Sequence, residues 1–106
     1  MGITYKNEIP FLEEQNLLEL TNSVQTPFYV YSQKNISDTF LELKKILNKD
    51  IYFSIKANSN QAIISLLNKL GAGADVVSQE EMQRALTAGV SSDRIILEGV
   101  GKSKSD

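Results

Sequence analysis

The stretch that decides the fold is IYFSIKANSNQAIISLLNKLGAGADVVSQEEMQRALTAGVSSDRIILEG, residues 51–99. Short runs of strand-forming residues alternate there with segments of helical apolar spacing. The pattern predicts strands at 51–56, 74–78 and 94–99, and helices at 60–71 and 79–89. A glycine, Gly71 or Gly89, follows each helix as its terminator. Because the strands start about 20 residues apart and are joined through helices, we expect a parallel sheet with right-handed crossovers.

Such a sheet is incomplete by itself, because three parallel strands leave two open edges and uncovered apolar faces. A complete (β/α)8 barrel needs about 250 residues, whereas this chain has 106. The last residues, GVGKSKSD, stop where another helix is expected. We therefore predict an α/β protein that forms the first β–α units of a partial (β/α)8 TIM barrel, as a fragment or as one part of a split protein.

Upstream of this pattern, one more strand and one more helix are predicted. Pro27 bars a helix in TPFYVYS, residues 26–32, whose aromatic and β-branched residues favour a strand. The segment 35–49 has helical spacing, with Asn35 or Ser37 as its N-cap. The expected apolar face of that helix consists of Ile36, Phe40, Leu43 and Leu47.

The chain is expected to form one small domain, in which an N-terminal segment precedes a barrel portion. Residues 1–26 are expected to be irregular apart from a short helix through Leu17, Leu18 and Leu20, and residues 27–106 to form the truncated barrel portion. The residues expected to face inward from the two later helices are Ile63, Leu67 and Leu70, and Met82, Ala85 and Leu86.

Composition excludes several classes of function. The composition is ordinary for a soluble domain, with an apolar fraction of 42% and a charged fraction of 23%. The net charge of −2 does not indicate a nucleic-acid-binding surface. The absence of cysteine and histidine excludes disulfides, thiolate nucleophiles, the Ser-His-Asp arrangement and Cys or His metal sites. No apolar stretch approaches the roughly 20 residues that cross a bilayer, and no signal-peptide core is present. We expect a cytoplasmic protein with no metal and no membrane partner.

One lysine stands out, because it ends the first predicted strand of the pattern. Strand side chains alternate between faces, so Tyr52, Ser54 and Lys56 share the face that would line a barrel. Active sites of such barrels lie at the carboxyl ends of the strands, where desolvation favours a neutral amine. A neutral amine can attack an aldehyde carbon, which is the chemistry of pyridoxal phosphate lysines. The alternative is a solvated lysine that ends an edge strand.

The motif YFSIKANSN, residues 52–60, resembles the cofactor-lysine motif of the fold-type III pyridoxal-phosphate decarboxylases, usually Tyr-Ala-Val-Lys-Ala-Asn. TPFYVYS is similar to the segment that leads into their barrel, which belongs to the alanine-racemase-like class. The segment from Leu67 to Ser103 is similar to their next two β–α units in order and spacing. The resemblance covers about residues 10–106, and EGVGKS at 98–103 favours the diaminopimelate decarboxylase branch.

The resemblance implies roles for particular residues. Lys56 matches the lysine that holds pyridoxal 5'-phosphate covalently, and Asp75 matches an acidic residue near it, the alternative being a strand-end carboxylate in solvent. Glu81 matches a glutamate close to the active site, but Ser78 and Glu81 also fit a capping box, and both interpretations stay open. Asn58 is expected to bond the local backbone rather than to act in catalysis.

Two further features of the motif region are weaker. Gly99 and Gly101 resemble a glycine pair after the third strand, a weak phosphate-loop signal. Where the closest members of the family show Ser-Gly-Gly-Glu-Leu, this chain has Ser78-Gln79-Glu80-Glu81-Met82, so side chains of unknown role replace the two glycines. This departure is compatible with relaxed selection.

The implied function is the N-terminal part of a decarboxylase that converts meso-diaminopimelate to L-lysine and carbon dioxide, inactive as this chain alone. The resemblance implies as partners an amino-acid substrate, the remainder of the barrel, a C-terminal β-domain and a second subunit. The alternatives are a non-catalytic remnant or interaction module, and a fragment of an ornithine-type or arginine-type decarboxylase.

Overall fold

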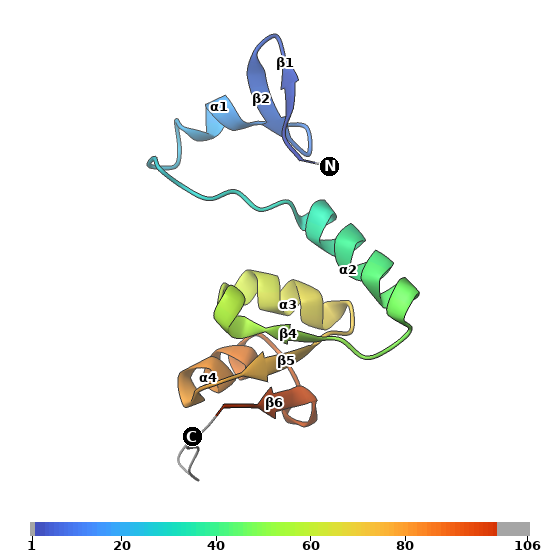
Figure 1. Ribbon diagram of the computed structural model, residues 1–106. Coiled ribbons are helices and arrows are strands. Elements are labelled where there is room, and N and C mark those ends of the chain that lie inside the picture. Colours follow the sequence, from blue (N-terminus) through green and yellow to red (C-terminus); the bar gives the residue numbers. More distant parts are fainter. Residues whose placement is uncertain (1, 100–106) are drawn as a thin grey trace. The chain divides into compact units, whose positions relative to one another are not determined.

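The computed structural model describes residues 2–99 and divides into two compact units between Thr39 and Phe40 (Figure 1). The division falls inside helix α2, Gln33–Leu47. The boundary predicted after residue 26 stays a prediction.

The first unit contains an antiparallel sheet of three short strands in the order β1-β2-β3. The strands are β1 (Thr4–Lys6), β2 (Ile9–Leu12) and β3 (Gln15–Asn16). Two-residue turns, Asn7-Glu8 and Glu13-Glu14, join them, and all four residues have φ between 52° and 68°. These values are typical of hairpin turns whose twist matches that of the strands, although glycine is the usual residue there.

The expectation that residues 1–26 are irregular was therefore wrong, because neither turn carries the glycine that would have signalled it. The short helix was correctly predicted: α1 spans Leu17–Leu20. Its N-cap is Asn16, whose side-chain oxygen accepts a hydrogen bond from the Glu19 backbone N–H at 3.1 Å.

The predicted strand at 26–32 does not form, since neither sheet of the described residues includes it. Strand propensity needs a hydrogen-bonding neighbour, and no described strand lies beside this segment. Helix α2 begins at Gln33, and its cap is Ser32 rather than Asn35 or Ser37, because the Ser32 Oγ accepts from the Asn35 N–H at 3.0 Å.

The predicted apolar face of α2 is only partly covered. Phe40 is buried, whereas Leu43 and Leu47 are 44% and 50% exposed.

The second unit holds the predicted parallel sheet, in the order β4-β5-β6. The strands are β4 (Tyr52–Ser54), β5 (Gly73–Val76) and β6 (Ile95–Leu97), each shorter than predicted. Helices α3 (Gln61–Lys69) and α4 (Gln79–Thr87) connect them, with 3-10 turns η1 (Ile55–Ala57) and η2 (Ser92–Arg94). The prediction of an α/β fold that forms part of a (β/α)8 barrel is confirmed.

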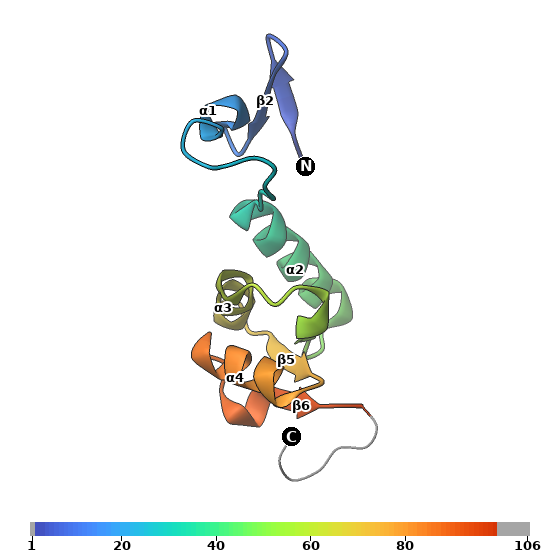
Figure 2. The same cartoon turned by 90° about the vertical axis from the view of Figure 1, so that its left-hand side faces the viewer.

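The core of this unit lies between the sheet and its two helices. Ala74 and Val76 of β5 pack there with Ile64 of α3, Ala85 of α4 and the fully buried Ile55. In the turned view, α3 and α4 lie on the same side of β5 and β6 (Figure 2). The other face of the sheet is therefore not covered by these helices.

Both glycines end their helices as predicted. After α3, Gly71 has φ of 107°, and the Ala72 N–H bonds to the Leu67 carbonyl at 2.9 Å. After α4, Gly89 has φ of 103°, and the Val90 N–H bonds to the Ala85 carbonyl at 3.0 Å. These bonds define Schellman caps, which need a left-handed residue that glycine adopts without a Cβ penalty.

The inward positions were mostly correct. Ile63, Leu67 and Ala85 are buried, Leu70 is half-buried, and Met82 packs against the core. Leu86 was wrongly placed, since it is 40% exposed, and Ile64, which is 2% exposed, was not predicted.

Candidate active site

The face of the sheet that the helices leave uncovered carries the candidate site. Ser54, Asp75 and Ile96 stand side by side in register on β4, β5 and β6. Asp75 points to this face because its strand neighbours, Ala74 and Val76, point into the core. This is the face that lines the interior of a (β/α)8 barrel.

The start of this face is filled by an aromatic ring. Tyr52 and Gly73 are partners in register, and a Cβ on Gly73 would lie 2.6 Å from the Tyr52 ring carbons. With the ring in this position, a residue without a side chain fits beneath it. Tyr52 therefore closes the end of the face where the strands begin, and the space beside Asp75 lies toward the end where they finish.

Lys56 lies just beyond the carboxyl end of β4, but the structure corrects its expected setting. The strand stops at Ser54, and Lys56 is the middle residue of the η1 turn, which the Asn58 N–H closes by bonding to the Ile55 carbonyl at 3.0 Å. The side chain is exposed rather than sheltered inside a barrel. The alternation that placed Lys56 in line with Tyr52 and Ser54 fails there, because a 3-10 turn does not keep the two-residue period.

Asp75 is half-buried, and its Oδ1 atom is out of contact with solvent. No hydrogen-bond donor within the described part of the chain reaches that oxygen. A buried carboxylate oxygen without a donor is costly in a finished fold. The site therefore fits a group that brings a hydrogen-bond donor or a positive charge to this face.

Ser78 and Glu81 form a modified cap at the start of α4. The Ser78 Oγ accepts from the Glu81 N–H at 3.2 Å, as the capping-box interpretation predicted. The Glu81 carboxylate accepts instead from the Val77 N–H at 3.0 Å, one residue before the expected partner. Glu81 thereby fixes the turn that follows β5, next to Asp75 in the sequence. Gln79 and Glu80, in place of the two glycines, are exposed in the first turn of the helix.

Asn58 bonds the local backbone, as predicted. Its Oδ1 accepts from the Asn60 N–H at 3.0 Å, and the Asn60 Oδ1 in turn accepts from the Ala62 N–H at 2.9 Å as the cap of α3. Of the predicted glycine pair, Gly99 has φ of 122°, and Gly101 lies outside the described residues.

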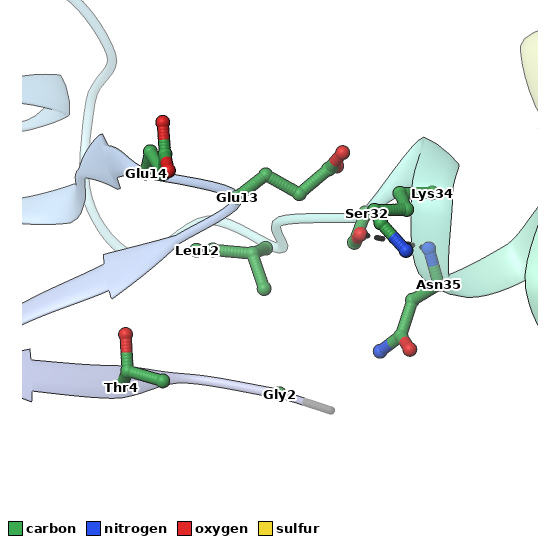
Figure 3. A pocket seen from close by; sticks show the side chains of 8 residues that line it. All are labelled: Gly2, Thr4, Leu12, Glu13, Glu14, Ser32, Lys34 and Asn35. Atoms are coloured by element: carbon green, nitrogen blue, oxygen red, sulfur yellow. Dashed lines mark hydrogen bonds between the residues drawn. The ribbon is translucent and has the colours of Figure 1, made fainter.

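A separate pocket of about 340 Å³ lies in the first unit (Figure 3). The Glu13 side chain extends there toward Lys34. The pKa of Lys34 is raised, mainly because its amine donates a hydrogen bond to the Asp38 carboxylate and is attracted by that charge, and to a smaller extent because of the charge of Glu13. The lining residues are Gly2, Thr4, Leu12, Glu13, Glu14, Ser32, Lys34 and Asn35. None of them belongs to the face that carries Asp75, so this pocket is not the predicted site.

Two further observations concern residues 2–99 as a whole. No helix in that range combines the length and the hydropathy of a membrane span. Likewise, no three acidic, His or Cys side chains in that range are grouped so that they could hold a metal ion.

The parallel strands, their covering helices and the lysine turn beyond β4 define the class as a (β/α)8-barrel protein, present in part. A family model described as the pyridoxal binding domain of pyridoxal-dependent decarboxylases matches residues 33–106. The chain belongs to this pyridoxal-dependent decarboxylase family, whose cofactor is pyridoxal 5'-phosphate.

Individual relatives of this chain lead to the same family assignment. A diaminopimelate decarboxylase of Helicobacter pylori is 46% identical over 91 residues, which are 83% of this chain and 22% of the relative. A crystal structure from Aquifex aeolicus matches with a TM-score of 0.89 at 39% identity, over 95% of this chain and 26% of its own. A crystal structure of Helicobacter pylori diaminopimelate decarboxylase complexed with L-lysine matches with a TM-score of 0.77 at 46% identity. The match covers 83% of this chain and 23% of the solved chain.

The chain thus corresponds to about the N-terminal quarter of these relatives. Its own residues fit the family's cofactor in two respects: Lys56 offers an accessible amine just past a strand end, and Asp75 offers an unpartnered acceptor on the neighbouring strand.

Proposed function

We propose that this chain is the cofactor-lysine segment of a diaminopimelate decarboxylase, which converts meso-diaminopimelate to L-lysine and carbon dioxide. The observation that carries the proposal is the position of Lys56, directly after β4 and within a match to the pyridoxal binding domain. The L-lysine in the related crystal structure supports the substrate class. The cytoplasmic location predicted from the sequence belongs to the same proposal.

Within this proposal, Lys56 is the residue that holds pyridoxal 5'-phosphate. Once bound, that cofactor supplies an acceptor for the electron pair left when a carboxylate departs. The chain's own part is to present the Lys56 amine on a turn whose base, Ile55, is 0% exposed and therefore fixed. The Lys56 side chain is exposed in this chain, and a lysine amine acts as a nucleophile where water is excluded from it.

Asp75 is the proposed companion of that lysine. Its Oδ1, which lacks a donor in the described residues, can accept a hydrogen bond from a cationic or N–H group on the open face. The carboxylate would hold such a group in place and balance its charge. Glu81, by accepting from the Val77 N–H, keeps the turn after Asp75 in its observed form.

The remaining parts of the site are proposed to come from outside this chain. The open face of β4, β5 and β6 needs the other strands of the barrel to close around it. We propose that these, a C-terminal β-domain and a second subunit complete the pocket. This accounts for the exposure of Lys56, because the elements that would exclude water from it are not among the residues described.

A chimera tests the proposal. This chain replaces the matching N-terminal segment of the Helicobacter pylori enzyme, to which it is 46% identical over 91 residues. We expect the chimera to release carbon dioxide from meso-diaminopimelate, and Lys56→Ala to abolish the release. Lys69→Ala, which removes an exposed lysine of α3, is the matched control and should leave activity intact.

Three results would contradict the proposal in different ways. A folded chimera that retains activity after Lys56→Ala would show that another group holds the cofactor. A folded chimera that acts on ornithine or arginine and not on diaminopimelate would assign the chain to another branch of the family. A folded chimera without activity on any of the three would favour a non-catalytic remnant.

A further inference from the structure

One arginine joins the segment after the Lys56 turn to helix α4, which lies much later in the sequence. The Arg84 Nη1 on α4 donates to the backbone carbonyl of Ser59 at 3.5 Å, across 25 residues of sequence. Ser59 lies three residues after Lys56, in the short segment that joins η1 to α3. Helix α4 also packs against η1, the turn that contains Lys56.

Two further hydrogen bonds lie within this segment. The Asn58 N–H bonds to the Ile55 carbonyl, and the Asn60 N–H bonds to the Asn58 Oδ1. These two bonds shape the segment between Lys56 and α3. Ile55, which is fully buried, fixes the beginning of the turn. The Arg84 bond fixes its end from outside.

Arg84 is well placed for this task because its helix is itself held. The Ser78 cap fixes the first turn of α4, and Ala85, next to Arg84, is 0% exposed in the core. The guanidinium therefore extends from an immobile backbone. It presents several N–H donors in a planar group, so it can reach a carbonyl from more than one direction.

We propose that Arg84 is a positioning residue for Lys56. By holding the Ser59 carbonyl, it restricts the turn and so sets the direction in which the lysine amine is presented. The inference has two halves: the structural half is that Arg84 holds the turn, and the functional half is that this directs the Lys56 amine. Only the functional half rests on the proposed role of Lys56. Because the bond is long and Arg84 is exposed, we expect an effect of severalfold rather than of orders of magnitude.

Amide hydrogen exchange on the full 106-residue chain tests the structural half. In Arg84→Ala, we expect the amides of Asn58 and Asn60 to exchange about two- to tenfold faster, the effect of losing one hydrogen bond. Arg84→Lys should restore part of the protection, since lysine can supply one donor. Gln83→Ala, an exposed neighbour on the same helix, is the matched control and should leave both amides unchanged.

Borohydride trapping of pyridoxal phosphate in the folded chimera described above, which supplies the rest of the site, tests the functional half. The ratio of labelling at Lys56 to labelling at Lys69 is measured by peptide mapping. We expect this ratio to fall severalfold in Arg84→Ala, to recover partly in Arg84→Lys and to stay constant in Gln83→Ala. A general loss of stability would change labelling at both lysines and would not follow this order.

The two measurements separate the possible failures. Unchanged exchange at Asn58 and Asn60 in Arg84→Ala would overturn the positioning role, as would an equal change in Gln83→Ala. If the chimera without further substitutions shows no preference for Lys56 over Lys69, the proposed function fails, while the exchange data still decide whether Arg84 holds the turn. Should Arg84→Ala fail to fold, Arg84→Gln carries the same test.

Discussion

Replacing Gly73 by alanine tests how closely β5 approaches its two neighbours. A Cβ at this position would lie 2.6 Å from the backbone carbonyl oxygen of Arg94 and 2.6 Å from two ring carbons of Tyr52. The ring of Tyr52 can rotate away, because that side chain is 37% exposed. The Arg94 carbonyl belongs to the backbone immediately before β6 and moves only if the strand moves.

The size of the effect follows from two opposing contributions. Overpacking at a buried position costs about 1–3 kcal/mol, and a clash with backbone favours the upper end. Alanine also restricts the unfolded chain, which returns about 0.4–1 kcal/mol. We therefore expect Gly73→Ala to lower the free energy of unfolding by about 2 kcal/mol. Adding Tyr52→Ala should not restore stability, since the contact with Arg94 remains.

The assay is urea unfolding followed by far-ultraviolet circular dichroism. Gly2→Ala is the control, because a Cβ on Gly2 would meet nothing within 4 Å. A midpoint for Gly73→Ala equal to those of the unsubstituted chain and the control would refute the reasoning. It would mean that β5 and β6 separate at no cost, so that the face carrying Asp75 is not rigidly defined.

Three more outcomes are expected. Ile55→Ala should cost about 2–5 kcal/mol in urea unfolding, because Ile55 is fully buried, whereas Ile96→Ala, at a 46% exposed position, should cost much less. Ser78→Ala should cost about 1 kcal/mol and lower the helical signal at the start of α4, since the Glu81 N–H loses its acceptor; an unchanged midpoint would count against the cap. Asp75→Leu should raise the stability of this chain by removing an oxygen without a donor; a loss of stability would show that the carboxylate has a partner. The same substitution should lower pyridoxal phosphate trapping at Lys56 in the chimera.

The sequence predicted the second unit well, because its signals are local. Apolar spacing gave α3 and α4, and Gly71 and Gly89 marked their ends through a backbone conformation that other residues adopt only at a cost. The family assignment, and Lys56 as the proposed cofactor lysine, came from a motif of adjacent residues. The sequence also contained one unused signal: Gly73, a glycine at a strand, indicates a close backbone approach.

The first unit was predicted poorly for the opposite reason. Its two hairpin turns use Asn7-Glu8 and Glu13-Glu14, which give no glycine signal, so the antiparallel sheet was missed. The strand predicted at 26–32 depended on a neighbour that the described residues do not supply. Arg84 gave no signal either, since its contact with Ser59 joins residues far apart in the sequence.

The sequence by itself determined the order of strands and helices in the second unit, the places where its helices end, and the family. These depend on neighbouring residues, whose spacing and backbone preferences act within one or two turns of chain. Only the tertiary structure decided that Lys56 lies on an exposed 3-10 turn, that the Asp75 Oδ1 is buried without a donor, and that Glu81 bonds to Val77. Burial and hydrogen bonding between separate elements depend on which surfaces pack together, and local spacing does not contain that information.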